Sequence, residues 1–182
     1  MCRLVKLLKL LAFVLLVCVC AIAAHVFQVL TTNILRPSVA RFHIPPQAFT
    51  LNELIRAVAR KHHVDPAIVK SIIAAESRFS SFALSPKGAV GVMQLMPETA
   101  RQFSVDPTVP EQNIDAGVRY LSLLLKRFAN RRDPLRRAIA AYNAGPRAVE
   151  RYHGVPPYRE TRTYVLRVLR FYKIYQNEVV AG

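Results

Sequence analysis

Helix-start signals recur in the part of this 182-residue chain that follows residue 50. A capping aspartate is followed directly by proline at Asp65-Pro66 and again at Asp133-Pro134. Aspartate accepts a hydrogen bond from the first free N–H groups of a helix, and proline fits the first turn because it has no N–H to satisfy. Met96-Pro97 predicts a short helix, and Asn113 is expected to cap a longer one. No segment alternates as a strand does, so at most a small hairpin is expected within residues 80–95.

Apolar residues recur at helical spacing after each of these signals, so each predicted helix has one face to bury. The predicted buried positions are Leu51, Leu54, Ile55, Val58, Ala59, Val69, Ile72, Ile73, Ile114, Val118, Leu121, Leu125, Phe128, Leu135, Ala138, Ile139, Tyr142, Val165, Val168, Leu169 and Tyr172. With 52% hydrophobic residues the chain can build a sizeable core. The sequence therefore predicts a mostly α-helical single domain over residues 50–178.

Residues 1–30 differ from this pattern. Three basic residues precede an unbroken apolar run over residues 10–24, which ends near the small residues of Ala21-Ile22-Ala23. This is the pattern of a cleavable secretory signal peptide. The alternative is an uncleaved membrane anchor, since weaker apolar character continues to Leu30. Both interpretations export the remainder to the periplasm or cell envelope, with proline-containing residues 31–49 as a tether.

The cysteines and the charge narrow the classes of function. Cys2, Cys18 and Cys20 all lie in the leader, so the domain has neither a disulfide framework nor a thiolate metal site. The five histidines have no ligand-like spacing, and no metal or other cofactor is expected. A formal net charge of +15 favours an anionic partner. Nucleic acid is disfavoured by the export signal and by the lack of an aromatic-basic platform.

Glu76 is the most unusual acidic residue in the chain. It follows Ile72 by four residues and Ile73 by three, and it therefore falls on an apolar helix stripe near the helix C-terminus. Burial and the negative end of the helix dipole both raise a carboxyl pKa. A carboxyl group that holds its proton near neutral pH can act as a general acid. The alternative is a frayed helix end where Glu76 meets solvent or pairs with Arg78.

Two further segments carry candidate ligand-binding groups. The loop SPKGAVGVMQLMP has glycines at Gly88 and Gly91, which permit a close approach to a ligand, and an amide at Gln94 that suits sugar hydroxyl and acetamido groups. Farther along, AYNAGP brings Tyr142 and Asn143 to a helix end. Each residue also has a structural interpretation, because methionine and tyrosine fill cores and asparagine caps helix ends.

Together these segments resemble a known family. Glu76-Ser77, SPKGAVGVMQLMPETA, NIDAGVRYL, AYNAGP and YRETRTYV occur in the order found in the soluble-lytic-transglycosylase-type domain of bacteria. The resemblance covers roughly residues 50–175 and implies a lysozyme-like fold that binds the glycan strands of peptidoglycan. It implies that Glu76 is the catalytic acid and base, and that the substrate-binding residues are Ser77, Ser85, Gln94, Met96, Tyr142 and Asn143. Val92 departs slightly from the family pattern, and Glu160 is interpreted as structural.

The residues alone do not decide how many carboxylates take part in catalysis. Most glycosidases use a pair of them, and spacing excludes none of Glu98, Asp115, Glu150 and Glu160. The resemblance implies that Glu76 acts alone on the bond between N-acetylmuramic acid (MurNAc) and N-acetylglucosamine (GlcNAc). The substrate's acetamido group would assist, a 1,6-anhydro sugar would form, and the enzyme would be a monomeric lyase. The alternatives are a lysozyme-type hydrolase and a non-catalytic peptidoglycan-binding module of a secretion or assembly apparatus.

Overall fold

The computed structural model describes residues 50–180, with side chains described to residue 177. The predicted leader, the tether and the three cysteines lie outside these residues. Within residues 50–180 no helix is both long enough and apolar enough to cross a bilayer.

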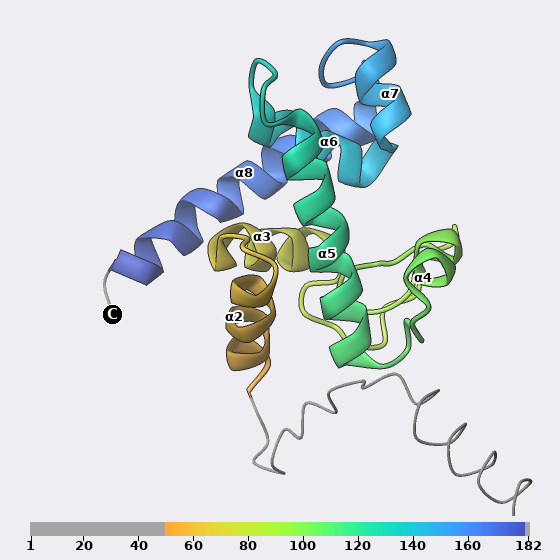
Figure 1. Ribbon diagram of the computed structural model, residues 1–182, viewed down its shortest axis with the longest axis vertical. Coiled ribbons are helices and arrows are strands. Elements are labelled where there is room, and N and C mark those ends of the chain that lie inside the picture. Colours follow the sequence, from red (N-terminus) through yellow and green to blue (C-terminus); the bar gives the residue numbers. More distant parts are fainter. Residues whose placement is uncertain (1–49, 181–182) are drawn as a thin grey trace, which may run out of the picture. The chain divides into compact units, whose positions relative to one another are not determined.

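The described residues form a helical domain (Figure 1). The helices are α2 (Leu51–Lys61), α3 (Pro66–Glu76), α4 (Pro97–Phe103), α5 (Pro110–Phe128), α6 (Pro134–Ala144), α7 (Pro146–Arg151) and α8 (Arg159–Val180). The expected hairpin is reduced to isolated bridges, in which Val90 pairs with both Leu84 and Leu95. The segment between α3 and α4 is therefore mostly loop, and the predicted mostly α-helical class is confirmed.

The caps of α2 and α3 are formed by residues close in sequence, and the one at α3 was predicted. Asp65 accepts a 2.8 Å hydrogen bond from the Ala67 N–H, as predicted. At α2, Thr50 and Glu53 cap each other's backbone N–H groups, a reciprocal arrangement called a capping box. The prediction for Asp133 is wrong in detail, because this residue adopts a left-handed φ of 52° and its side chain makes no capping bond.

The prediction that Asn113 caps a helix is also wrong. α5 begins earlier, at Pro110, and places Asn113 within its first turns, fully buried. The Asn113 side chain bonds backbone groups of Met93 and Val90 in the loop between α3 and α4, and the carbonyl of Pro107 in the loop between α4 and α5. A local sequence signal could not reveal this role because its partners are up to 23 residues away.

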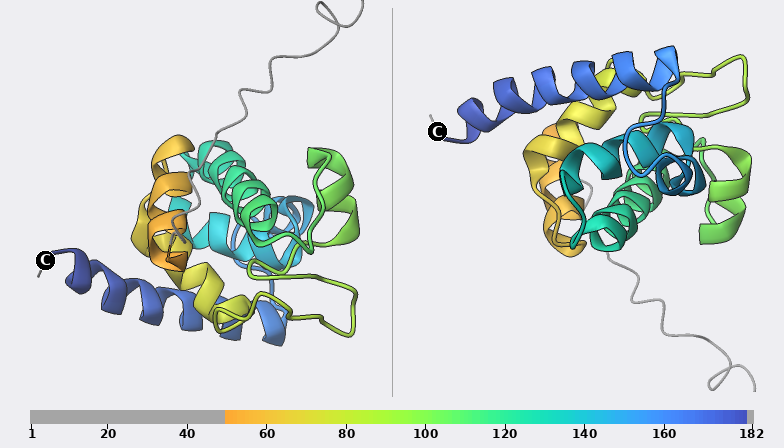
Figure 2. Two further views of the ribbon diagram at one scale, coloured as in Figure 1. Left: turned by 90° about the horizontal axis from the view of Figure 1, so that it is seen from below. Right: turned by 90° about the horizontal axis from the view of Figure 1, so that it is seen from above.

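α3 supplies the centre of the core. Ile72 and Ile73 have no exposed surface, and α3 packs along α8, which lies beside it in both views of Figure 2. The predicted stripes are confirmed for most positions, while a few rim residues stay only partly buried, namely Leu51, Leu54, Leu125, Leu135, Tyr142, Leu169 and Tyr172. The helix that ends in Glu76 is thus held rigidly by its neighbours.

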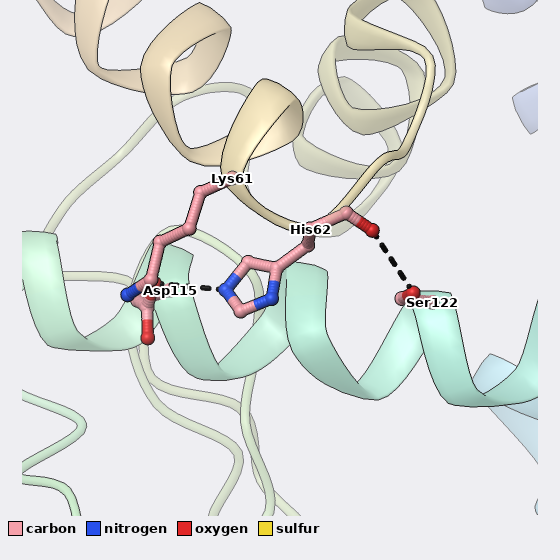
Figure 3. A network of polar contacts seen from close by, with 4 residues as sticks. All are labelled: Lys61, His62, Asp115 and Ser122. Carbon is pink, nitrogen blue, oxygen red and sulfur yellow. Dashed lines mark hydrogen bonds and ion pairs between the residues drawn. The ribbon is translucent and has the colours of Figure 1, made fainter.

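A polar network joins the end of α2 to α5 (Figure 3). Asp115 Oδ1 lies 2.7 Å from Lys61 Nζ and 2.9 Å from His62 Nε2, while the Ser122 hydroxyl donates to the His62 carbonyl. Partial burial would raise the pKa of Asp115, but the hydrogen bonds from Lys61 and His62 outweigh it and hold the pKa below its usual value. Ser122 contacts the His62 backbone rather than its ring. This cluster therefore links α2 to α5 and is not a nucleophilic triad.

Candidate active site

A pocket of about 290 Å³ opens where the C-terminal end of α3 meets the following loop, the end of α6 and the start of α8. Its lining residues are Glu76, Ser85, Pro86, Lys87, Ala89, Gln94, Met96, Tyr142, Asn143 and Glu160. Six of the seven predicted site residues are therefore brought together. Ser77 is the exception, because it terminates α3 and its hydroxyl donates to the Ile73 carbonyl at 3.3 Å.

Glu76 is the last residue of α3 and is partly buried at this pocket. Burial raises its pKa from 4.5 to about 7, since the charged carboxylate loses hydration there. A hydrogen bond from Tyr164 and the positive charge of Arg167 offset part of the increase, whereas the negative charge of Glu160 adds to it. A carboxyl group with a pKa near 7 can both give and accept a proton at neutral pH.

Tyr164 is the site residue that sequence reasoning missed. Its buried hydroxyl donates a 2.7 Å hydrogen bond to Glu76 Oε1 across 88 residues of sequence. Burial and the neighbouring Glu76 raise the pKa of Tyr164 well above 10, so the phenol remains a donor at neutral pH. Tyr164 belongs to the YRETRTYV segment noted in the sequence, but only the packing of α8 on α3 reveals that it contacts Glu76.

Tyr142 reaches the pocket from α6. Its hydroxyl donates to the Met93 carbonyl at 3.1 Å, and its ring lies 5.5 Å from that of Tyr120. Burial raises the pKa of Tyr142 well above 10, with Glu76 and Tyr120 contributing, so Tyr142 stays neutral. Tyr142 thus supports the loop as well as lining the pocket.

Gln94 likewise lines the pocket and supports the loop. It adopts a left-handed φ of 50°, and its Nε2 donates to the carbonyls of Ala83 and Gly91, each at 3.0 Å. Both amide protons therefore hold the loop, and Oε1 is the atom that Gln94 offers to a ligand. Side-chain amides accept hydrogen bonds from hydroxyl groups well.

Asn113, on α5, holds the same loop through hydrogen bonds. Its Oδ1 accepts from the Met93 N–H at 2.8 Å, and its Nδ2 donates to the carbonyls of Val90 and Pro107 at the same distance. Gly91 must be glycine here, because it has a φ of +80° and an added Cβ would lie 2.4 Å from Asn113 Nδ2. The loop that carries Ser85 and Gln94 is therefore anchored on α5.

The pocket lining also includes two charged residues, Lys87 and Glu160. Lys87 Nζ lies 2.9 Å from Glu160 Oε2, with both side chains mostly exposed. This hydrogen bond and the charge of Lys87 lower the pKa of Glu160, and Asn143 acts in the same direction. Asn143 in turn accepts a 2.8 Å hydrogen bond from Thr161. The pocket thus holds one carboxyl group whose pKa is raised and one whose pKa is lowered.

The remaining candidate residues are placed as follows. Ser85 accepts a hydrogen bond from the Ala89 N–H, and Met96 precedes α4 with 39% of its surface exposed.

Three of the four candidate second carboxylates lie outside the pocket lining and pair with bases, namely Glu98 with Arg101, Asp115 with Lys61, and Glu150 with Arg127. Among residues 50–180 no cluster of three or more potential ligands could hold a metal ion.

Solved structures define the class of fold. An inactive mutant of lytic transglycosylase Slt from Pseudomonas aeruginosa aligns with a TM-score of 0.63 and 32% identity, covering 75% of this chain and 25% of that one. A complex of the 70-kDa soluble lytic transglycosylase with bulgecin A aligns with a TM-score of 0.62 and 28% identity, with the same coverage. The domain therefore has the mostly helical, lysozyme-like fold of these enzymes.

Sequence comparison then gives the family. The family model of the transglycosylase SLT domain matches residues 53–165. The chain belongs to this family, and the resemblance drawn from its motifs is confirmed.

Curated relatives share this domain within longer chains. The membrane-bound lytic murein transglycosylase C of Actinobacillus pleuropneumoniae is 32% identical over 123 residues, 59% of this chain and 34% of the relative. The soluble lytic murein transglycosylase of Salmonella typhimurium is 32% identical over 150 residues, 69% of this chain and 23% of the relative. The chain thus spans about a third or less of the length of these relatives.

Proposed function

We propose that this chain is an exported bacterial lytic transglycosylase that cleaves the β-1,4 bond between MurNAc and GlcNAc in peptidoglycan. The observation that carries the proposal is Glu76, a carboxyl with a pKa raised to about 7, bonded to Tyr164 and lining a polar pocket. The relatives' names support the substrate class. The pocket also contains the amide and hydroxyl groups that sugar binding requires.

The proposed reaction uses Glu76 twice. Its carboxyl proton passes to the glycosidic oxygen, and the C1–O bond of MurNAc breaks with its electron pair on the leaving GlcNAc. The acetamido group of the same MurNAc stabilises the positive charge at C1. Glu76, now ionised, takes the proton of the C6 hydroxyl, and O6 attacks C1 to form a 1,6-anhydro ring. Donation from Tyr164 stabilises the carboxylate between these steps.

A lysozyme-type hydrolase is the second candidate, and one observation favours it. Glu160 lines the same pocket and is ionised, so Glu76 and Glu160 have the separated pKa values of an acid and a base. Against this, Glu160 is mostly exposed and already paired with Lys87. An exposed, paired carboxylate is a weak base for activating water.

Product analysis separates the two reactions. Purified chain acting on isolated glycan strands should release MurNAc ends lighter by one water than hydrolysis products. Glu160→Gln should still give the anhydro product, even if its rate changes. A reducing MurNAc end as the main product, lost in Glu160→Gln, would establish the hydrolase instead. No cleavage at all by the folded wild-type chain would support a non-catalytic binding module.

Export forms part of the proposal and rests on the apolar run over residues 10–24, which lies outside the described residues. Cell fractionation followed by N-terminal sequencing should find residues 31–182 in the envelope, either without the leader or still attached to it. Recovery of the intact chain from the cytoplasmic fraction would contradict export while leaving the proposed reaction untouched.

A further inference from the structure

The outer side of α8 carries basic and apolar side chains that take no part in the proposed reaction. α8 lies at the edge of the domain in both views of Figure 2, with its inner side packed on α3. Leu166 and Ile174 point outward from it with 62% and 48% of their surface exposed. We define the α8 stripe as Arg162, Leu166, Arg170, Lys173 and Ile174. The first three are spaced four residues apart, and Lys173 and Ile174 follow Arg170 by three and four residues, so the five lie along one side of the helix.

The charged residues of the α8 stripe are all basic. Arg162, Arg170 and Lys173 are exposed, and no ion pair joins any of them to an acid within the described side chains. The acid nearest to the stripe in sequence, Glu160, is paired with Lys87 instead. Among the described side chains, three cations without an acidic partner and two exposed aliphatic side chains therefore form a surface that is both basic and apolar.

We propose that the α8 stripe docks on the surface of an anionic phospholipid bilayer. Lipid phosphates would accept hydrogen bonds from the cations, and Leu166 and Ile174 would enter the boundary between headgroups and acyl chains, as at interfacial helices. A sugar polymer could pair with the cations but has no acyl chains between which the aliphatic side chains could insert. If the apolar run at residues 10–24 is retained as an anchor, it holds the domain next to a bilayer.

Tryptophan fluorescence can test this directly, because the chain contains no tryptophan. Leu166→Trp and Ile174→Trp each introduce a single reporter into the full chain, reconstituted in vesicles of phosphatidylcholine with or without phosphatidylglycerol. Leu123→Trp on α5 is the matched control, since Leu123 is 47% exposed and Ile174 48%. The two stripe reporters should shift their emission to the blue and be quenched by brominated lipid in the anionic vesicles only, while the control stays unchanged.

The role of charge has its own comparison. Arg162→Gln, Arg170→Gln and Lys173→Gln are combined in the Ile174→Trp chain. This change should lower the equilibrium constant for docking of the α8 stripe about a hundredfold. The matched control changes Arg131, Arg132 and Arg136 to Gln, which removes the same charge from the exposed turn before α6 and its first turn. That control should keep the blue shift. Salt at 1 M should reverse the shift, because it shortens the Debye length to about 3 Å.

Three outcomes would overturn the inference. The stripe reporters could behave alike in both kinds of vesicle, which would remove the role of anionic lipid. Leu123→Trp could shift as much as they do, which would reduce the effect to general proximity. Purified peptidoglycan could produce the shift in place of vesicles, which would assign the α8 stripe to the wall. None of these readouts depends on glycan cleavage, so they stand apart from the proposed reaction.

Discussion

At the scale of single residues, Glu76 is the proposed acid and base, and its replacement is the first prediction. Glu76→Gln keeps the shape but removes the titrating proton, and should lower the rate of glycan cleavage by at least about 10²–10⁴-fold. In the wild type, kcat/KM should fall about tenfold per pH unit above pH 7, because only the protonated carboxyl can act as the acid. Turnover assayed from pH 5 to 9 checks both expectations. Full activity in the Gln variant would remove Glu76 from the mechanism.

Tyr164→Phe gives the second prediction. The hydrogen bond from Tyr164 lowers the pKa of Glu76, so its loss should move the alkaline limb of the pH–rate profile to higher pH. The maximum rate should also fall about tenfold or more, since the carboxylate formed after proton donation loses its donor. Tyr172→Phe is the matched control on α8, because the Tyr172 hydroxyl donates to Asp65 at the same 2.7 Å distance, in a contact outside the pocket.

The control must keep the wild-type pH profile for the second prediction to hold. If both variants shift the profile equally, Tyr164 acts through the packing of α8 rather than through Glu76. If Tyr164→Phe loses activity only in proportion to lost folding, its hydroxyl has no role in the reaction.

At the scale of elements, the loop between α3 and α4 depends on Asn113, and this gives the third prediction. Asn113→Ala removes three hydrogen bonds and leaves the buried Met93 N–H without its partner. The free energy of unfolding should fall by about 2–4 kcal/mol, since each buried group left unpaired costs about 1–3 kcal/mol. Activity of the remaining folded protein should fall as well, because the loop positions Ser85 and Gln94. Urea unfolding and activity at low temperature measure the two effects.

Ser122→Ala is the control for this change. It removes one hydrogen bond from the same helix, at the junction with α2 rather than at the loop. It should cost about 1 kcal/mol and leave activity per folded molecule unchanged. Equal activity losses in both variants would show that α5 affects the site only through overall stability.

The same elements mark how far the sequence could predict the structure. Apolar spacing locates α2, α3, α6 and α8, and a capping signal marks the start of α3, because both depend on neighbours within a few residues. Asn113 was misassigned because its true partners belong to a loop folded against it, and Asp133 because backbone conformation, not its side chain, starts α6. α7 had no separate signal. The positions of Glu76 and Gln94 were predictable, whereas the contact of Tyr164 with Glu76 required the tertiary packing.

At the scale of the whole molecule, the raised pKa of Glu76 links the active site to stability. In the unfolded chain this carboxyl has its ordinary pKa of 4.5, and in the folded protein a pKa of about 7. Between these values the folded state binds the proton more tightly. The free energy of unfolding therefore decreases as the pH rises through this window. Below pH 4.5 both states are protonated and no penalty applies, whereas above pH 7 the folded protein carries a buried carboxylate at a cost of about 3 kcal/mol.

The fourth prediction follows from that linkage. Glu76→Gln has no proton to bind, so its stability relative to the wild type should rise with pH between 4.5 and 7 and level off above, a total change of about 3 kcal/mol. Urea unfolding of both proteins at several pH values measures the difference, in which the titration of all other groups cancels. Glu98→Gln removes an exposed charge on α4 and controls for the change in net charge of this basic protein. A constant difference between Glu76→Gln and wild type across the window would mean that Glu76 is solvated in the folded state, and that its capacity to hold a proton at neutral pH, on which the proposed reaction depends, is absent from the free enzyme.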